Sequence, residues 1–283
     1  MKDVLYFAPQ KMNEALKLLA KHRGKITILA GGTDLVPKMN HHVLKPEMLL
    51  YVGGLGLDYI KKKDGKVVIG TATPWSKVAS SSVIARMAPA LAEAAQQSSC
   101  VAIKSTATVG GNLGSASPAA DLATPLLVMD AQLRLASARK SRVVALKDFF
   151  KGPGETVRKS DELITEVHVP LLKGKSVFLK VGRRKAMTLS VVNVAVRLEM
   201  AGKTCKDARI ALGSMAPTPI RCSKAEGLLK GKAIDKDLIS RCAAEAVAES
   251  NPIDDGRATA WYRKKAGTAL VFRALGQVAG IQT

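Results

Sequence analysis

The sequence ILAGGTDL occupies residues 28–35, and the sequence TVGGNLG occupies residues 108–114. The first ends an apolar run typical of a buried strand, and each segment contains two adjacent glycines. Adjacent glycines let successive backbone N–H groups turn toward one point and remove the Cβ atoms that would block a ligand. Each segment is therefore a candidate loop for an anion such as phosphate, although a Gly-Gly pair is also typical of a tight turn without a ligand.

Neither segment has the spacing of the common nucleotide-binding loops. Neither reads G-x-G-x-x-G before a helix, so a nicotinamide-type Rossmann fold is not indicated. Neither continues into Gly-Lys-Ser/Thr, which excludes a Walker A loop. Thr33 and Thr108 place hydroxyl donors beside the glycines. Two separate loops suggest a pyrophosphate that is held from both sides.

The pattern of apolar residues in residues 1–172 predicts alternating strands and helices. Such alternation indicates an α/β arrangement. Apolar runs predict strands at residues 3–7, 25–30, 48–52, 66–72 and 132–137. Apolar residues at helical spacing predict helices at 12–24, 35–39 and 83–98. A further helix is expected after Thr73, with Pro74 as its first helical residue. Another is expected from a cap at Ser117-Pro118 to about Met129.

The character of the sequence changes near residue 173. Strands are expected at 177–182, 191–200 and 205–215 without long helices between them, and helices follow at about 236–250 and 257–278. Runs of strands followed by runs of helices indicate an α+β unit. We therefore expect two domains, residues 1–172 and 173–283, which the length of 283 residues also favours.

Composition narrows the class of protein. A hydrophobic fraction of 47% excludes intrinsic disorder. No apolar run is long enough for a transmembrane helix, and the first residues do not resemble a signal peptide, so we expect a cytoplasmic protein without a membrane span. The four cysteines lie far apart and form no CxxC pair, which favours buried, reduced thiols and no bound metal.

The chain carries a formal net charge of +21. Such an excess is compatible with an acidic partner, an acidic ligand or nucleic acid, and equally with a solvated basic surface. Aromatic residues make up only 4% of the chain and do not interleave with the basic ones. Because single-stranded nucleic acids are bound largely by aromatic stacking, we expect no nucleic-acid partner.

Together, ILAGGTDL (28–35) and TVGGNLGSASPAADLATPLL (108–127) resemble the FAD-binding medium subunit of the molybdenum hydroxylases. This family includes carbon monoxide dehydrogenase, xanthine dehydrogenase, nicotinate dehydrogenase and 4-hydroxybenzoyl-CoA reductase. The resemblance covers nearly the whole chain, because FAPQKMNEALKLL (7–19), VVIGTATPWSKV (67–78) and RRKAMTLSVVNVAVRL (183–198) are also similar to family segments.

The resemblance implies a vanillyl-alcohol-oxidase-like FAD-binding domain of two α/β subdomains, followed by a small α+β C-terminal domain with an antiparallel sheet and helices. It places the pyrophosphate of FAD between Gly31–Asp34 and Thr108–Asn112. The cofactor-binding residues expected from it are Leu29, Ala30, Gly31, Gly32, Thr33, Asp34, Leu35, Thr108, Gly110, Gly111, Asn112, Ser115, Asp121 and Lys185.

Several of these residues have a second interpretation. Asp121 matches a family position near the cofactor and would accept hydrogen bonds from its hydroxyl groups, or it compensates a helix dipole in a first turn. Asn112 would reach the flavin side of the phosphates, or it only tolerates a left-handed turn. Arg183, Arg184 and Lys185 would approach the flavin edge or an acidic nucleotide, although such a charge run is more often solvated.

The resemblance also implies a complex. A large subunit would carry the molybdopterin site, with molybdenum or tungsten, and a small subunit would carry two 2Fe–2S clusters. Electrons would pass from the clusters to FAD and then to NAD(P)+ or another acceptor. Two further readings are a stand-alone FAD-dependent oxidoreductase of the same fold and a basic nucleic-acid-binding protein, which would leave both glycine segments without a purpose.

The chain departs from the family pattern at several points. Thr188 stands where the family often has an acidic residue, so any charge there near the flavin is absent. The cysteine-rich insertion that holds an additional cluster in the benzoyl-CoA reductases is missing. His41 and His42 have no carboxylate at ligand spacing and are expected on a surface loop. No catalytic residue can be identified from the sequence.

Overall fold

The computed structural model describes residues 4–184 and 187–282. Its first unit is a three-stranded parallel sheet flanked by helix α1 (Met12–Lys21), with the strand order β1 (Leu5–Phe7), β3 (Met48–Tyr51), β2 (Ile26–Leu29). The apolar face of α1 buries Ala15, Leu16 and Leu19 against this sheet. Helix α2 (Leu35–Asn40) follows β2 and buries no side chain.

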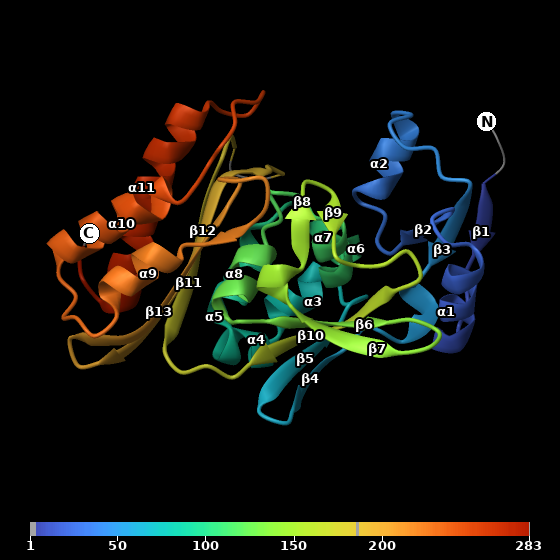
Figure 1. Cartoon of the computed structure of the whole chain (residues 1–283), viewed down its shortest axis with the longest axis horizontal. Coiled ribbons are helices and arrows are strands. Elements are labelled where there is room, and N and C mark those ends of the chain that lie inside the picture. The colour runs from blue at the N-terminus through green and yellow to red at the C-terminus, as the bar shows by residue number, and fades with distance from the viewer. Residues whose placement is uncertain (1–3, 185–186, 283) are drawn as a thin grey trace.

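A five-stranded sheet forms the second unit (Figure 1). All of its pairings are antiparallel, in the order β4 (Ile60–Lys63), β5 (Lys66–Gly70), β10 (Leu163–Pro170), β6 (Gln132–Ala136), β7 (Ser141–Ala145). Six helices accompany it: α3 (Trp75–Ser80), α4 (Ser82–Met87), α5 (Pro89–Gln97), α6 (Val101–Thr106), α7 (Val109–Gly114) and α8 (Ala123–Val128). Short elements complete it: the 3-10 turns Gly53–Leu55 and Leu146–Asp148, and the hairpin β8 (Phe150–Gly152) with β9 (Glu155–Thr156).

The third unit is an antiparallel sheet with helices on one face. Its strand order is β11 (Lys175–Gly182), β12 (Ser190–Ala201), β13 (Thr204–Gly213), β14 (Ile220–Arg221). The covering helices are α9 (Ser223–Leu229), α10 (Lys236–Ala248) and α11 (Ala260–Ala279). This confirms the expected fold class, with α/β and antiparallel units followed by an α+β unit.

Several predicted elements differ from those in the structure. The helix expected at 83–98 is two helices, because Ala88 leaves the helical conformation before Pro89. Pro74 is the N-cap of α3 and not its first helical residue. The cap at Ser117 leads into a turn, and α8 begins only at Ala123. Strand β10, the central strand of the second sheet, was missed because its eight residues look like an interdomain connection.

The structural units share buried side chains. Phe178, Ala195 and Ala211 of the third sheet lie in the same apolar cluster as the helices of the second unit. Figure 1 shows β11 and β12 standing beside α5 and α8. The domain boundary near residue 173 stays a prediction, and it falls in the segment that links β10 to β11.

Three of the four cysteines are buried in the structure, and the fourth is not. Cys205, Cys222 and Cys242 are buried, and desolvation raises the pKa of the Cys242 thiol to about 12, which keeps it protonated and unreactive. Cys100 is only half-buried, so the expectation of four buried thiols was wrong for it. Within residues 4–184 and 187–282, no helix has the length and apolar character needed to cross a bilayer.

A buried arginine fastens the long C-terminal helix to the third sheet. Arg263 on α11 is only 1% exposed, and its guanidinium donates to the carbonyl oxygens of Val191 (2.6 Å) and Ser214 (3.1 Å). Asp255 compensates its charge at 2.7 Å. Arg257, hydrogen-bonded to the same carboxylate, holds the pKa of Asp255 well below its usual range, so this partner stays ionised.

We expect the Asp255→Asn substitution to lower the free energy of unfolding by about 3 kcal/mol, because it leaves the buried Arg263 charge unpaired. Urea denaturation at neutral pH measures this. Since the folded-state pKa of Asp255 is depressed, its contribution is present above the unfolded value of about 3.9 and fades as the pH falls below it.

The matched control is Asp58→Asn. Asp58 pairs with Lys77 at 2.9 Å, but the two side chains are 47% and 50% exposed. Such a surface pair contributes about 0.5 kcal/mol or less. Equal losses in the two variants would contradict the role assigned to Asp255.

Candidate functional site

The first glycine segment leaves strand β2 with its backbone donors unused. Among the described residues, none of the five consecutive N–H groups of residues 31–35 donates to a protein acceptor. Gly32 has φ +71°, a left-handed conformation that glycine adopts without strain, and Asp34 is right-handed helical. A run of unpaired N–H groups at such a bend is a concave donor surface suited to an anion.

Charges beside these N–H groups are balanced locally. Asp34 would repel an anion, but its carboxylate forms an ion pair with Lys38 at 2.7 Å on the next turn of α2. Leu29 is the last residue of β2, and its carbonyl oxygen accepts from Val52 N–H, which fixes where the segment begins. Ala30 and Thr33 are half-buried beside the two glycines.

The second glycine segment is helical, which corrects the expectation of an open loop. Thr108 is the N-cap of α7 and accepts from Gly111 N–H at 3.0 Å. The N–H groups of Val109 and Gly110 donate to the carbonyl oxygens of residues 73 and 71. These N–H groups therefore serve the fold, and the donors that remain in this segment are the hydroxyl hydrogen of Thr108 and the side-chain amide of Asn112.

The two segments meet in space, although 76 residues separate them. A Cβ atom on Gly31 would overlap the carbonyl oxygen of Thr106 and lie 3.2 Å from Ala107 Cα. Only glycine permits this approach between two backbones. Figure 1 shows the same neighbourhood, with α6 and α7 beside the end of β2. The structure thus brings residues 31–35 and 106–112 into one site.

A third segment, residues 71–75, holds the second one in place. Trp75 donates twice, from its backbone N–H to Ala107 O (2.9 Å) and from its indole Nε1 to Thr108 O (3.1 Å). A Cβ on Gly110 would lie only 2.6 Å from Thr71 Cβ, so this glycine is also needed for close packing. Sequence reasoning missed Trp75, which has no recognisable motif and looks like any core aromatic residue.

Asn112 contains an unsatisfied buried atom. Its Oδ1 is inaccessible to solvent and has no hydrogen-bond partner among the described residues. Ser115, at the end of α7, donates to the carbonyl oxygen of Asn112 at 3.1 Å. A buried acceptor without a donor is costly in a folded protein unless a ligand or water supplies the missing hydrogen. The left-handed alternative for Asn112 is wrong, because it lies inside α7.

Asp121 lies in a buried polar cluster between the second and third units. Its carboxylate accepts from Ser98 (2.8 Å), Ser190 (2.5 Å) and Asn193 (3.2 Å), and it forms a buried ion pair with Lys180 at 2.6 Å. Its side chain does not cap α8, which begins two residues later, so compensation of a first turn is not its role. Every donor to the Asp121 carboxylate among the described residues is a protein side chain.

The remaining predicted residues are placed less fully. Lys185 lies outside the described residues. Arg183 donates to Gly256 O at 2.9 Å, and both Arg183 and Arg184 are exposed. The Thr188 hydroxyl accepts from Arg183 N–H at 3.1 Å, so it braces its own loop. His41 and His42 are exposed after α2, as expected for a surface loop.

The residues present fit a dinucleotide such as FAD. Unpaired N–H groups at 31–35 and the Thr108 hydroxyl supply donors for a diphosphate. Within residues 4–184 and 187–282, no group of three or more metal-ligating side chains converges.

Two family models and several known proteins match this chain over most of its length. The family described as "FAD binding domain in molybdopterin dehydrogenase" matches residues 2–172, and "CO dehydrogenase flavoprotein C-terminal domain" matches residues 177–278. The glyceraldehyde dehydrogenase medium chain of Sulfolobus acidocaldarius is 32% identical over 97% of this chain and 98% of its own length. The xanthine dehydrogenase FAD-binding subunit of Escherichia coli O157:H7 is 30% identical over 92% and 89%.

Solved structures have the same fold. Carbon monoxide dehydrogenase from Hydrogenophaga pseudoflava superposes with a TM-score of 0.95 at 29% identity, covering 98% of this chain and 97% of that one. Quinoline 2-oxidoreductase from Pseudomonas putida 86 superposes with a TM-score of 0.93 at 26% identity, covering 99% of both chains. The chain therefore belongs to the family of FAD-binding medium subunits of the molybdenum hydroxylases, which are oxidoreductases, and its cofactor is FAD.

Proposed function

We propose that the diphosphate of FAD lies between residues 31–35 and Thr108. The observation that carries this proposal is the run of five N–H groups without acceptors, at a bend whose first residue, Gly31, lies against Thr106 and Ala107. The Thr108 oxygen already accepts from Gly111, so its hydrogen is free to donate to a phosphate oxygen. Asn112 Oδ1 would accept a hydrogen from the cofactor only if its side chain turned, because this atom is inaccessible to solvent.

Further members of the expected set would surround the cofactor without binding the diphosphate. Leu29 and Ala30 precede the unpaired N–H groups, the Leu35 side chain follows them at the start of α2, and Ser115 donates to the Asn112 carbonyl oxygen at the end of α7. Asp121 would accept from a cofactor hydroxyl only by exchanging one of its present donors, such as Ser98 or Ser190. We propose Lys185 as a contact of the flavin edge on the resemblance alone.

We further propose that the chain works as the electron-transferring subunit of a multi-subunit oxidoreductase. FAD, when bound, supplies both one-electron and two-electron chemistry, and the protein supplies its binding and orientation. A partner would carry 2Fe–2S clusters, a second partner the molybdopterin site, and NAD(P)+ or another acceptor would receive the electrons. Support comes from the relatives, which include a carbon monoxide dehydrogenase medium chain and a caffeine dehydrogenase subunit.

The tagged chain purified from its own host tests the assembly. We expect molybdenum or tungsten and iron to co-purify in fixed ratio with FAD, measured by metal analysis and by the flavin spectrum. A flavin-containing protein without either metal and without partners would favour the stand-alone oxidoreductase. A preparation that also fails to take up added FAD would contradict the cofactor site itself.

Rapid mixing of the FAD-loaded chain with NADH tests the acceptor. Because electron transfer to a nicotinamide is reversible in principle, we expect NADH to bleach the flavin absorption in the blue. Persistence of the oxidised spectrum with both NADH and NADPH would contradict NAD(P)+ as the acceptor. It would leave the cofactor site intact, so the two parts of the proposal fail separately.

We expect the Gly31→Ala substitution to weaken FAD binding about tenfold to a hundredfold. The added Cβ would overlap the Thr106 carbonyl oxygen and force the two segments apart. Overpacking of this kind costs about 1–3 kcal/mol, and about 1.4 kcal/mol corresponds to a factor of ten in affinity. Quenching of flavin fluorescence during titration measures the affinity, and thermal unfolding of the cofactor-free protein reports whether the variant folds.

Gly227→Ala is the control for this substitution. Gly227 lies in α9, has no neighbouring atom within 4 Å of a built Cβ and needs no positive φ. Alanine there is expected to leave FAD affinity unchanged and to stabilise the helix by about 0.5–1 kcal/mol. FAD affinity that is as high in Gly31→Ala as in Gly227→Ala would contradict the proposed diphosphate site.

A second variant tests the hydrogen bond by which Trp75 holds the Thr108 end of the same site. Trp75→Phe keeps an aromatic ring but removes the Nε1 donor to Thr108 O. A net hydrogen bond contributes about 0.5–1.5 kcal/mol, so we expect FAD affinity to fall roughly twofold to tenfold. Trp261→Phe is the matched control, because Trp261 is 68% exposed on α11 and should leave the affinity unchanged. Equal FAD affinities in the two variants would contradict a role of the Trp75 indole N–H in holding the site.

A further inference from the structure

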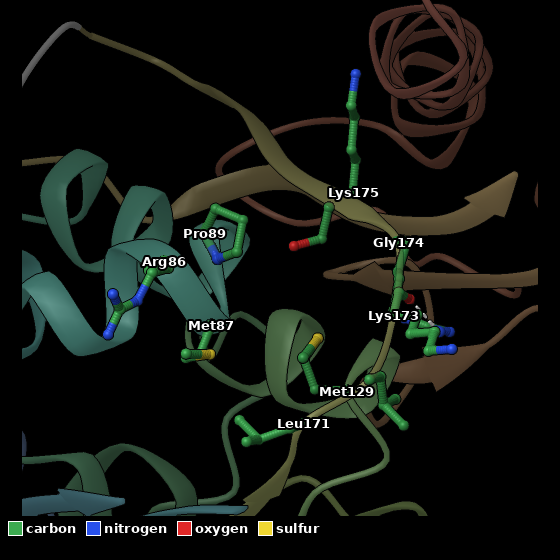
Figure 2. A pocket seen from close by; sticks show the side chains of 11 residues that line it. Arg86, Met87, Pro89, Met129, Leu171, Lys173, Gly174 and Lys175 are labelled. Carbon is green, nitrogen blue, oxygen red and sulfur yellow. Dashed lines mark hydrogen bonds between the residues drawn. The ribbon is translucent and has the colours of Figure 1, made fainter.

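A pocket of about 430 Å³ lies where the second and third units meet. Its walls come from the end of α4, the start of α5, the end of α8, the connection between β10 and β11, and strand β12 (Figure 2). It shares no residue with segments 31–35, 71–75 or 106–112, so it is separate from the proposed FAD site. Its volume is in the range of small-molecule sites in proteins.

The lining combines cationic and apolar side chains and contains no acidic residue. The cationic ones are Arg86, Lys173, Lys175 and Arg197, and the apolar ones are Met87, Pro89, Met129, Leu171 and Leu172. In Figure 2, Met87, Met129 and Leu171 lie together across the pocket from Lys175. One side of the pocket is therefore apolar, and its rim is positively charged.

Arg197 is the buried member of this group. It is only 3% exposed, donates to the carbonyl oxygen of Lys173 (2.5 Å) and pairs with Asp207 at 2.8 Å. Its Nε is inaccessible to solvent and donates to no acceptor among the described residues. Because a solvent-inaccessible atom is also out of reach of a ligand, and because Glu199 lies 3.6 Å from the same guanidinium, Arg197 serves as part of the pocket wall and its charge is compensated within the fold.

The other three cations have no compensating charge. Neither Arg86 nor Lys173 nor Lys175 forms an ion pair within residues 4–184 and 187–282. All three are exposed, and Figure 2 shows the charged ends of Arg86 and Lys175 turned outward on separate sides of the pocket. Exposed side chains change rotamer within nanoseconds, so an anion in the pocket would draw these ends inward.

The start of α5 forms part of the pocket wall. Its N-cap, Ala88, has no side-chain acceptor, and Pro89 at the first helical position has no N–H. Ser176, the second residue of β11, accepts from Ala90 N–H at 3.3 Å. The N–H groups of Leu91 and Ala92 donate to Ala88 O, so the first turn of α5 is satisfied within the protein and only Pro89 of this helix lines the pocket.

We propose that this pocket is a binding site for a small organic phosphate, a phosphomonoester with an apolar chain or ring. A phosphomonoester carries a charge of about −1.5 to −2 at neutral pH, which matches several uncompensated cations better than a single carboxylate does. The apolar body would pack on the methionine and leucine side chains, and the phosphate would lie at the cationic rim. Because the ligand would contact both units, its binding would stiffen the junction between them.

The test uses the full chain saturated with FAD, so that the cofactor site cannot take up the probe. Hexyl phosphate is titrated while the 13C-methyl signals of methionine are followed by NMR. We expect the signals of Met87 and Met129 to shift and that of Met215, buried in the core of the third unit, to stay unchanged. Met87→Leu and Met129→Leu variants assign the two signals.

Hexanol and inorganic phosphate separate the two halves of the site. We expect each to bind at least about tenfold more weakly than hexyl phosphate, because each lacks either the charge or the apolar body. Inorganic phosphate that binds as tightly as hexyl phosphate would overturn the apolar part of the proposal. Hexanol that binds as tightly would overturn the anionic part.

The double variant Arg86→Glu/Lys175→Glu tests the location. Both side chains are exposed, so the variant should fold, which thermal unfolding verifies. We expect hexyl phosphate affinity to fall at least about tenfold while FAD affinity stays unchanged. Lys21→Glu, an exposed residue of α1, is the control for a change of charge elsewhere. Unchanged affinity in the double variant, or no shift of Met87 and Met129 at millimolar probe, would overturn the site.

Discussion

The close approach of two backbones at Gly31 is the constraint on which the FAD site depends. Residues 31–35 can present five free N–H groups to a ligand only because the bend is supported from below by Thr106 and Ala107. The supporting segment is itself fixed by the residues around Trp75, which engage the carbonyl oxygens of residues 107 and 108. The flexible glycines are thus held by a rigid hydrogen-bonded frame, which is the preorganisation that ligand binding requires.

The C-terminal unit is coupled to this frame through buried polar groups. Asp121, in the chain just after α7, is bound by Lys180, Ser190 and Asn193 of the third sheet. Buried hydrogen-bonded charges contribute little net stability but strongly disfavour any other relative placement, because displacement leaves them unpaired. Together with Phe178 in the shared apolar cluster, they fix the face that the third sheet turns toward α5 and α8.

The net charge of +21 is not spread as an undifferentiated basic surface. Many arginines are matched locally, such as Arg142 with Glu162 and Arg221 with Glu226, and these carboxylates serve structure. The cations at the junction pocket lie beside apolar side chains, so that pocket combines positive charge with an apolar wall. The distribution of charge therefore carries more information than its total.

Most elements followed from the sequence by itself, because hydrophobic periodicity is a local property of the chain. The family and the cofactor followed from the resemblance of residues 28–35 and 108–127 to a known family, which is also readable along the chain. The sequence determined neither the helical state of residues 109–114 nor the antiparallel pairing around β10, which depend on distant partners such as the carbonyl oxygens of Thr71 and Thr73. The hydrogen bonds of Trp75 and the lining of the junction pocket could not be predicted from the sequence either. Each brings together residues from distant segments, and no local pattern in the sequence connects those segments. Only the tertiary structure decides which backbone N–H groups donate to acceptors within the protein and which remain free for a ligand, because the acceptors lie on distant segments.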